Sequence, residues 1–108
     1  MDLLSILQRA IKERRSIEFE YNKSGKVPGR REGDPHAVFI HTRTNNTTVD
    51  IYQTGGVSDT SQNIPGWRPF LLKHLDKVKI LNRQFEIADG YASNPASGKY
   101  NRIIYKVK

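Results

Sequence analysis

The sequence has 108 residues and a mass of 12.4 kDa, which is enough chain for one domain and too little for two. Hydrophobic residues make up 36% and charged residues 27% of the chain, yet apolar positions recur throughout, which argues against wholesale disorder. The absence of cysteine excludes disulfides, thiolate nucleophiles and cysteine-ligated metals. No apolar run approaches the roughly twenty residues of a membrane span, and residues 1–11 lack the features of a signal peptide. We therefore expect a single soluble, cytoplasmic domain over residues 1–108.

The charge of the chain is its first positive clue to function. Eighteen Lys and Arg against eleven Asp and Glu give a formal net charge of +7 and a pI near 9.9. An excess of this size on one small domain favours an anionic partner, such as nucleic acid, a nucleotide or an acidic protein. A solvated basic surface with no specific site explains the charge equally well.

The first element predicted along the chain is an amphipathic helix over residues 3–15. Its apolar residues recur at helical spacing, and Gln8, Arg9 and Lys12 fill the other face. Asp2 is placed to cap the N-terminus, and Arg14 and Arg15 stand where cations favour a helix C-terminus. The apolar face must pack against the rest of the chain, whose pattern is that of a sheet.

Short strands are predicted for most of the remaining chain. Alternating or apolar runs indicate strands at 17–21, 37–40, 49–54, 67–73, 77–81 and 103–107. Loops or turns are predicted at 23–29, 34–35, 44–47, 55–66 and 93–99, and the pattern at 85–91 is ambiguous. Strands this close in sequence pair antiparallel. The fold class is therefore α+β and mostly β: an N-terminal helix packed on a small antiparallel sheet or barrel.

The sequence offers little for catalysis or metal binding. His36 and His41 are five residues apart in a predicted strand, so they point to opposite faces and are not expected to share a metal. Asp34 is interpreted as a turn residue before Pro35 rather than as a partner of His36. No phosphate-binding glycine loop or serine nucleophile motif occurs. We expect no catalytic residue, no metal site and no cofactor.

Arg68 is the basic residue with the most informative position. It stands between Trp67 and Phe70 in a predicted strand, where it must either pair with a carboxylate or be presented to an anion. Tyr21, Tyr52 and Trp67 are candidates for stacking or hydroxyl contacts beside it. The alternative is that the two aromatic neighbours belong to the core and that Arg68 pairs with Glu18, Glu20 or Asp50.

The order of these segments resembles the WYL domain family. The resemblance runs from Leu4 to Phe85 and rests on five pieces of sequence: the helix ending in Arg-Arg, the strand Ile17-Glu18-Phe19-Glu20-Tyr21, the segment Asp34-Pro35-His36, the strand end Tyr52-Gln53-Thr54-Gly55-Gly56, and the run Trp67-Arg68-Pro69-Phe70-Leu71-Leu72. The tripeptide Trp-Tyr-Leu that gives the family its name does not occur here.

This resemblance implies a helix on an Sm-like, SH3-type β-barrel and a role in ligand sensing or transcription regulation. Such modules usually follow a helix-turn-helix in bacterial regulators or are attached to CRISPR-associated proteins. The family's basic pocket is thought to bind a negatively charged ligand, including single-stranded nucleic acid. By position, the residues that would bind this ligand are Arg68, His36, Arg30, Arg31, Tyr52 and Tyr21.

The printed sequence starts two residues before the helix, with no helix-turn-helix ahead of it. We expect a stand-alone ligand module, a partner of a separate regulator protein, or a fragment of a larger regulator. Two other classes of function stay open: a small basic ribonuclease of the bacterial toxin type, and a protein-interaction module that forms a homodimer.

Overall fold

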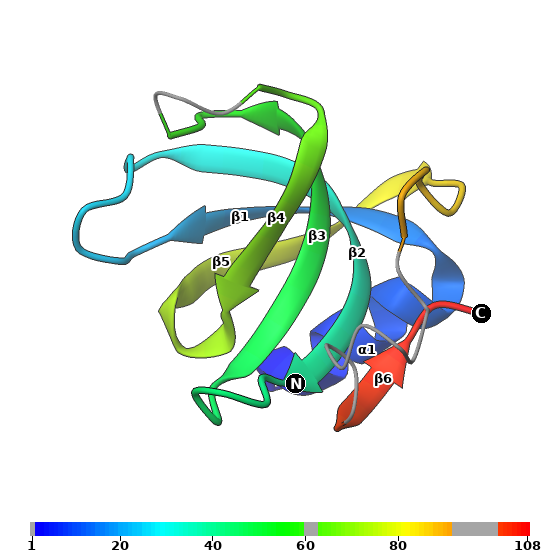
Figure 1. Ribbon diagram of the computed structural model, residues 1–108. Coiled ribbons are helices and arrows are strands. Elements are labelled where there is room, and N and C mark those ends of the chain that lie inside the picture. Colours follow the sequence, from blue (N-terminus) through cyan, green and yellow to red (C-terminus); the bar gives the residue numbers. More distant parts are fainter. Residues whose placement is uncertain (1, 60–62, 92–101) are drawn as a thin grey trace.

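The computed structural model describes residues 2–59, 63–91 and 102–108 and contains one α-helix followed by six strands (Figure 1). The elements are α1 (Leu3–Glu13), β1 (Arg15–Tyr21), β2 (Arg30–Ile40), β3 (Thr47–Gly56), β4 (Gly66–Leu71), a 3-10 turn η1 (Leu72–His74), β5 (Leu75–Gln84) and β6 (Ile103–Lys106). The predicted helix, the hairpin at 44–47 and the C-terminal strand are confirmed. Within the described residues, 85–91 contains no helix or strand, and the predicted loop at 93–99 lies outside them.

Helix α1 begins and ends where its capping residues dictate. The Asp2 carboxylate accepts a hydrogen bond of 2.8 Å from the Ser5 N–H, which satisfies one free donor of the first turn. Arg14 adopts the left-handed conformation with φ of 52° and donates its own N–H back to the helix. The helix therefore ends at Glu13, two residues before the predicted end, and Arg15 already belongs to β1.

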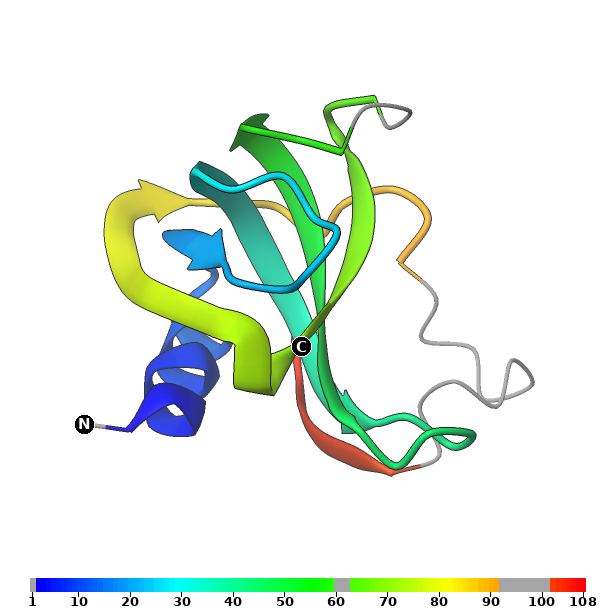
Figure 2. The same cartoon turned by 90° about the vertical axis from the view of Figure 1, so that its left-hand side faces the viewer.

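The sheet has the order β4-β3-β2-β1-β5, and β2 also pairs with β6. All pairings are antiparallel, and β2 is long and bent enough to pair with β1 at its start and with β6 at its end (Figure 2). A register shift between Pro35 and Ala37 marks an irregularity within β2. This bend wraps the sheet around the core and carries the two ends of β2 to different regions of the molecule.

The prediction that Asp34 and Pro35 form a turn is wrong. Both residues lie inside β2 and are buried. The Asp34 carboxylate accepts a hydrogen bond of 2.5 Å from the Ser16 hydroxyl on β1, which gives the buried carboxylate a partner. Pro35 sits at the register shift, the kind of place where a strand accommodates a residue without an N–H.

The core lies between α1 and the concave face of the sheet. Leu7, Ala10 and Ile11 are at most 1% exposed, and the helix packs against β1, β2, β5 and β6. The sheet contributes Ile17, Phe19, Val38, Val49, Ile51 and Phe70 to the same apolar cluster. The predicted packing of the apolar face of the helix is confirmed at Leu7 and Ile11, whereas Leu4 on the same face is only partly buried.

The sheet does not close into a barrel within the described residues, because β4 and β5 do not pair. The free edge of β4 is occupied by other groups. The Leu71 N–H donates to the Tyr21 hydroxyl at 2.9 Å, the Trp67 carbonyl accepts from the Arg68 guanidinium at 3.0 Å, and Pro69 has no N–H to offer. These contacts leave few backbone groups for another strand. The prediction of a small antiparallel sheet is confirmed, and the predicted barrel closure is not.

Candidate anion-binding cleft

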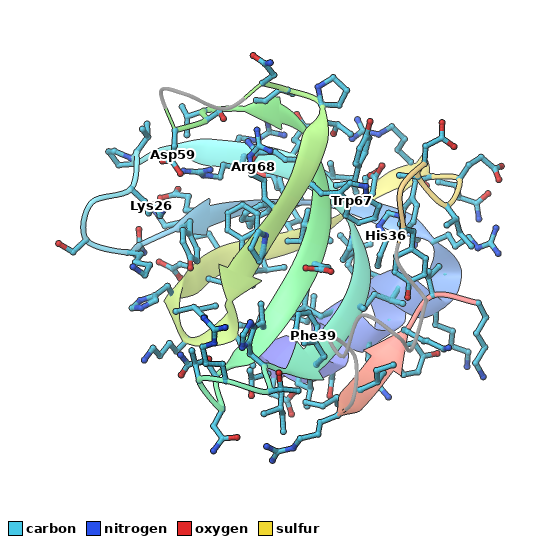
Figure 3. The ribbon with its side chains drawn as sticks, viewed as in Figure 1. Lys26, His36, Phe39, Asp59, Trp67 and Arg68 are labelled. Carbon is cyan, nitrogen blue, oxygen red and sulfur yellow. The ribbon has the colours of Figure 1, made fainter. Side chains whose placement is uncertain are left out.

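A cleft of about 420 Å³ opens along β4 and the loop that follows β1. The side chains at its cationic end come from the loop after β1, from β2, from the segment after β3 and from β4. Figure 3 shows Arg68 beside the upper part of β4, with Asp59 and Lys26 to its left. The residues that line this cationic cleft are Tyr21, Lys23, Lys26, Arg31, His41, Thr44, Asn46, Thr48, Asp59, Arg68, Pro69, Phe70 and Leu71. Four permanent cations therefore face one carboxylate.

Arg31 lies at the bottom of the cleft and is 1% exposed. Its guanidinium donates to the Val27 carbonyl at 3.0 Å and to the Gln53 side-chain oxygen at 3.3 Å. The guanidinium carbon also lies 5.5 Å from the centre of the Phe70 ring, within the range of a cation–π contact. The Arg31 Nε is buried without a hydrogen-bond partner. One donor of a buried cation is thus unused.

Arg68 reaches the same cleft from β4 and is 9% exposed. It donates to the carbonyls of Trp67 and Asn63 at 3.0 and 2.5 Å, and its buried Nε has no partner. No carboxylate among the described residues lies within ion-pair distance of Arg68. The alternative expectation, a pair with Glu18, Glu20 or Asp50, is therefore wrong: Glu18 pairs with Arg30 and Glu20 with Lys77.

Asp59 is the only carboxylate among the described residues that line the cleft. It accepts a hydrogen bond of 3.0 Å from the Val27 N–H and lies 3.5 Å from the Lys26 ammonium and 3.6 Å from the Arg31 guanidinium. The Val27 hydrogen bond, followed by these two cations, lowers the pKa of Asp59 below its usual value. Asp59 is therefore ionised at neutral pH and neutralises part of the positive charge.

Two aromatic rings form the apolar wall of the cleft. Tyr21 and Phe70 meet edge to face with ring centres 4.8 Å apart, so each fixes the position of the other. Burial raises the pKa of the Tyr21 hydroxyl, which stays neutral and accepts the Leu71 N–H. The wall holds the end of β1 against the end of β4.

The other end of the cleft is polar and comes from the β2–β3 hairpin. The Arg43 N–H donates to His41 Nδ1 at 3.1 Å, which leaves Nε2 as the ring nitrogen without a hydrogen bond in the described part of the chain. The side-chain amide of Asn46 makes no hydrogen bond within the described part of the chain. Both groups are available to hydrogen-bond a bound molecule.

His36 lies apart from Arg68, although the two were expected in one cleft. Trp67 and Arg68 are neighbours on a strand and point to opposite faces of the sheet, and His36 contacts Trp67 at a ring distance of 4.7 Å. Figure 3 shows His36 and Trp67 on the side of β4 away from Lys26 and Asp59. His36 is 0% exposed. Its position is that of a core residue.

Both ring nitrogens of His36 are engaged. Nδ1 lies 2.7 Å from the Asp34 carbonyl, and Nε2 accepts the Ala88 N–H at 3.1 Å. The ring also packs against Phe85 and Tyr91. Burial lowers the pKa of His36, so the ring is neutral near pH 7. Through the Ala88 hydrogen bond and these ring contacts, His36 holds the segment 85–91 against β2.

Arg30 and Tyr52 are likewise placed outside the cleft. Arg30 is exposed and pairs with Glu18 at 3.2 Å and with Glu32 at 2.7 Å. Tyr52 packs on Trp67 at a ring distance of 5.3 Å, on the opposite face from Arg68. Of the six expected ligand-binding residues, the structure brings together Tyr21, Arg31 and Arg68.

Several cleft residues were not predicted from the sequence. Lys23 and Lys26 carried a usable signal, because they are two cations in a short loop directly after the strand that ends at Tyr21. Asp59 and Asn46 had no such signal in the sequence, because only the pairing of β2 with β3 brings them to the cleft. Tertiary topology, not local pattern, assembles this part of the site.

Three further findings bear on function. Among the described residues, no cluster of three or more His, Asp or Glu side chains is arranged to hold a metal ion. No helix in the described ranges has the length and apolar character needed to span a membrane. No curated protein and no solved structure matches the chain.

One family model does match, and it covers the helix, β1 and β2. The matching model is the WYL domain, over residues 2–45. This match agrees with the resemblance found in the sequence. WYL domains are generally regulatory and ligand-sensing rather than catalytic. The chain is thus similar to the WYL domain over residues 2–45, a part that includes α1, β1 and β2.

Proposed function

We propose that this protein is a non-enzymatic ligand-sensing module whose cationic cleft binds a phosphate-bearing ligand, either single-stranded nucleic acid or a nucleotide. The observation that carries the proposal is the state of Arg68: a buried guanidinium with no carboxylate among the described residues and an unused Nε. A buried charge without an ionic partner is costly, and a bound anion would supply that partner. Arg31 offers a second unused Nε in the same cleft.

The remainder of the cleft suits a nucleotide. A planar guanidinium grips phosphate through paired hydrogen bonds, and Lys23 and Lys26 add charge at the rim. Tyr21 and Phe70 give the cleft an apolar wall, while the Asn46 amide and the His41 ring offer hydrogen bonds to a base or sugar. The expected binding energy comes from neutralising phosphate and from packing, and no bond is made or broken.

The ribonuclease alternative receives no support from His36. A general base must reach its substrate, whereas His36 is 0% exposed and has both ring nitrogens occupied. We expect the purified protein not to hydrolyse RNA, DNA or nucleotides at a rate that depends on His36. Turnover abolished by His36→Ala would favour the enzyme instead.

The proposal is tested by fluorescence anisotropy with a labelled single-stranded oligonucleotide. Arg68→Gln should weaken binding at least about tenfold, because it removes a positioned charge-assisted contact. Arg9→Gln is the matched control: it removes the same charge from an exposed residue on α1. It should change the affinity by no more than about twofold, through net charge alone.

The salt dependence separates phosphate binding from other modes. Affinity should fall as salt rises, because phosphate contacts release counterions. Equal effects of the two substitutions, or an affinity that salt does not change, would contradict the proposed site. Circular dichroism of each variant checks that it is folded.

A further inference from the structure

Asp59 occupies the cationic cleft, although the proposed ligand is itself an anion. Its carboxylate accepts a hydrogen bond of 3.0 Å from the Val27 N–H and lies within 3.6 Å of the nearest charged nitrogens of Lys26 and Arg31. These are the kinds of donor that an incoming phosphate would use. A group of this chain therefore already fills part of its own anion site.

This contact divides the cations of the cleft into two sets. Arg31 and Lys26 are engaged by Asp59, whereas Arg68 has no carboxylate within the described chain. An anion that binds at Arg68 alone shares the cleft with the negative charge of Asp59. An anion that also uses Arg31 and Lys26 must first displace that carboxylate.

Displacement favours a ligand with more charge than a carboxylate. A phosphodiester or a carboxylate carries one negative charge, the same as Asp59. Its contacts with Arg31 and Lys26 would therefore be little stronger than those that Asp59 loses. A terminal phosphate monoester carries about −1.5 to −2 at neutral pH and three strong acceptor oxygens. It can engage Arg31, Lys26 and Arg68 together, which outweighs the contacts that Asp59 loses.

Resting on the function proposed above, we propose that Asp59 is a specificity-determining residue that makes the cleft select a terminal phosphate monoester over phosphodiesters and carboxylates. The ligand class is then a 5′-phosphorylated single strand or a nucleoside monophosphate. Displacement also breaks the link between the segment after β3 and the loop 22–29, because Asp59 and Val27 stand on these two segments. Binding would thereby change the loop contacts at the mouth of the cleft.

The test uses two oligonucleotides of one sequence, labelled at the 3′ end, with either a 5′-phosphate or a 5′-hydroxyl. Their affinities are measured by anisotropy at one ionic strength for wild type, Asp59→Asn and Glu86→Gln. Asn keeps an acceptor for the Val27 N–H, so the loop stays in place. Glu86→Gln makes the same change in charge at a side chain that is 98% exposed.

Wild type should bind the phosphorylated strand about tenfold more tightly, since only the monoester displaces Asp59. In Asp59→Asn the hydroxyl strand should bind several times more tightly, and the ratio between the strands should fall to about threefold or less. Glu86→Gln should keep the wild-type ratio. An unchanged ratio in Asp59→Asn, or weaker binding of both strands, would overturn the inference, because Asp59 would then serve only to position Arg31.

Amide hydrogen exchange gives a second readout. The Val27 N–H loses its acceptor when Asp59 is displaced, so its exchange should quicken on addition of the phosphorylated strand. Unchanged exchange at saturation would contradict displacement. If neither strand binds wild type, the proposed function itself fails. If both bind equally and still depend on Arg68, only the role of Asp59 is overturned.

Discussion

Arg31 and Arg68 illustrate how much of this site depends on single side chains. Both guanidiniums are buried. Arg31 donates to one backbone carbonyl and to the Gln53 side-chain oxygen, Arg68 donates to two backbone carbonyls, and the Nε of each lacks a partner. The accepting oxygens fix the orientation of each planar guanidinium, and its unpaired Nε–H is left to donate to a ligand. The two arginines therefore enter the cleft already oriented, which lowers the entropic cost of gripping an anion.

His36 should make stability depend on pH. Its folded pKa lies below the ordinary 6.5 because burial disfavours the charged ring, so the unfolded chain takes up its proton first as pH falls. The free energy of unfolding should thus decrease between pH 7.5 and 5.5, by at most about 1.4 kcal/mol per pH unit from this residue. Urea denaturation across this range measures it.

His36→Gln is the variant that isolates this effect. Glutamine keeps an acceptor for the Ala88 N–H and does not titrate, so the pH dependence should be flatter than in wild type. If the free energy of unfolding varied with pH in the same way in wild type and His36→Gln, protonation of His36 would not contribute to this pH dependence. The comparison does not require the variant to match wild type in absolute stability.

The Tyr21 hydroxyl should stabilise the open edge of the sheet. Tyr21→Phe keeps the ring against Phe70 but leaves the Leu71 N–H without its acceptor, which should cost about 1 kcal/mol. Tyr105→Phe is the control, since the Tyr105 hydroxyl makes no hydrogen bond within the described chain. Equal stability of the two variants in urea would contradict this role of Tyr21.

At the scale of elements, α1 covers the core through a narrow apolar face. Leu7 is 0% exposed and packs in the main cluster, so Leu7→Ala should lower the free energy of unfolding by about 2–5 kcal/mol. Leu72→Ala, at a partly buried position, should cost clearly less. A melting temperature that Leu7→Ala leaves unchanged would reject the packing of α1 on the sheet.

The elements themselves were largely predictable, for physical reasons that are local. The 3.6-residue period and the Asp2 cap define α1, and strict alternation at Ile17, Phe19 and Tyr21 defines β1. The extent of β2 was not predictable. Its start at Arg30 and its path through Pro35 depend on pairing with β1 and β3, which no local pattern encodes.

At the scale of the molecule, three of the six predicted ligand-binding residues meet in the cleft. Arg68, Arg31 and Tyr21 come together because β1, β2 and β4 curve around one concave face. His36 was misplaced because one step along a strand changes the face, and only the structure shows that it shares the face of Trp67. Asp59 was not predicted as a site residue, yet it lines the cleft beside Lys26 and Arg31.

The whole molecule thus presents a bent, open sheet whose unclosed side is a cationic cleft. Two side chains that hydrogen-bond the unpaired edge of β4 also line the cleft: the Tyr21 hydroxyl accepts from the Leu71 N–H, and Arg68 donates to the Trp67 carbonyl. The open edge of the sheet and the cleft therefore share Tyr21 and Arg68. Ligand binding and the stability of this edge should therefore be coupled.

The most direct test of the anion site is an NMR titration that follows the arginine Nε–H resonances as inorganic phosphate is added to the wild-type protein. The Nε–H signals of Arg31 and Arg68 should shift first and saturate together, because these are the buried donors without partners. The signal of Arg30, which is exposed and already paired with two glutamates, should move little. Shifts at exposed arginines with none at Arg31 and Arg68 would contradict the account.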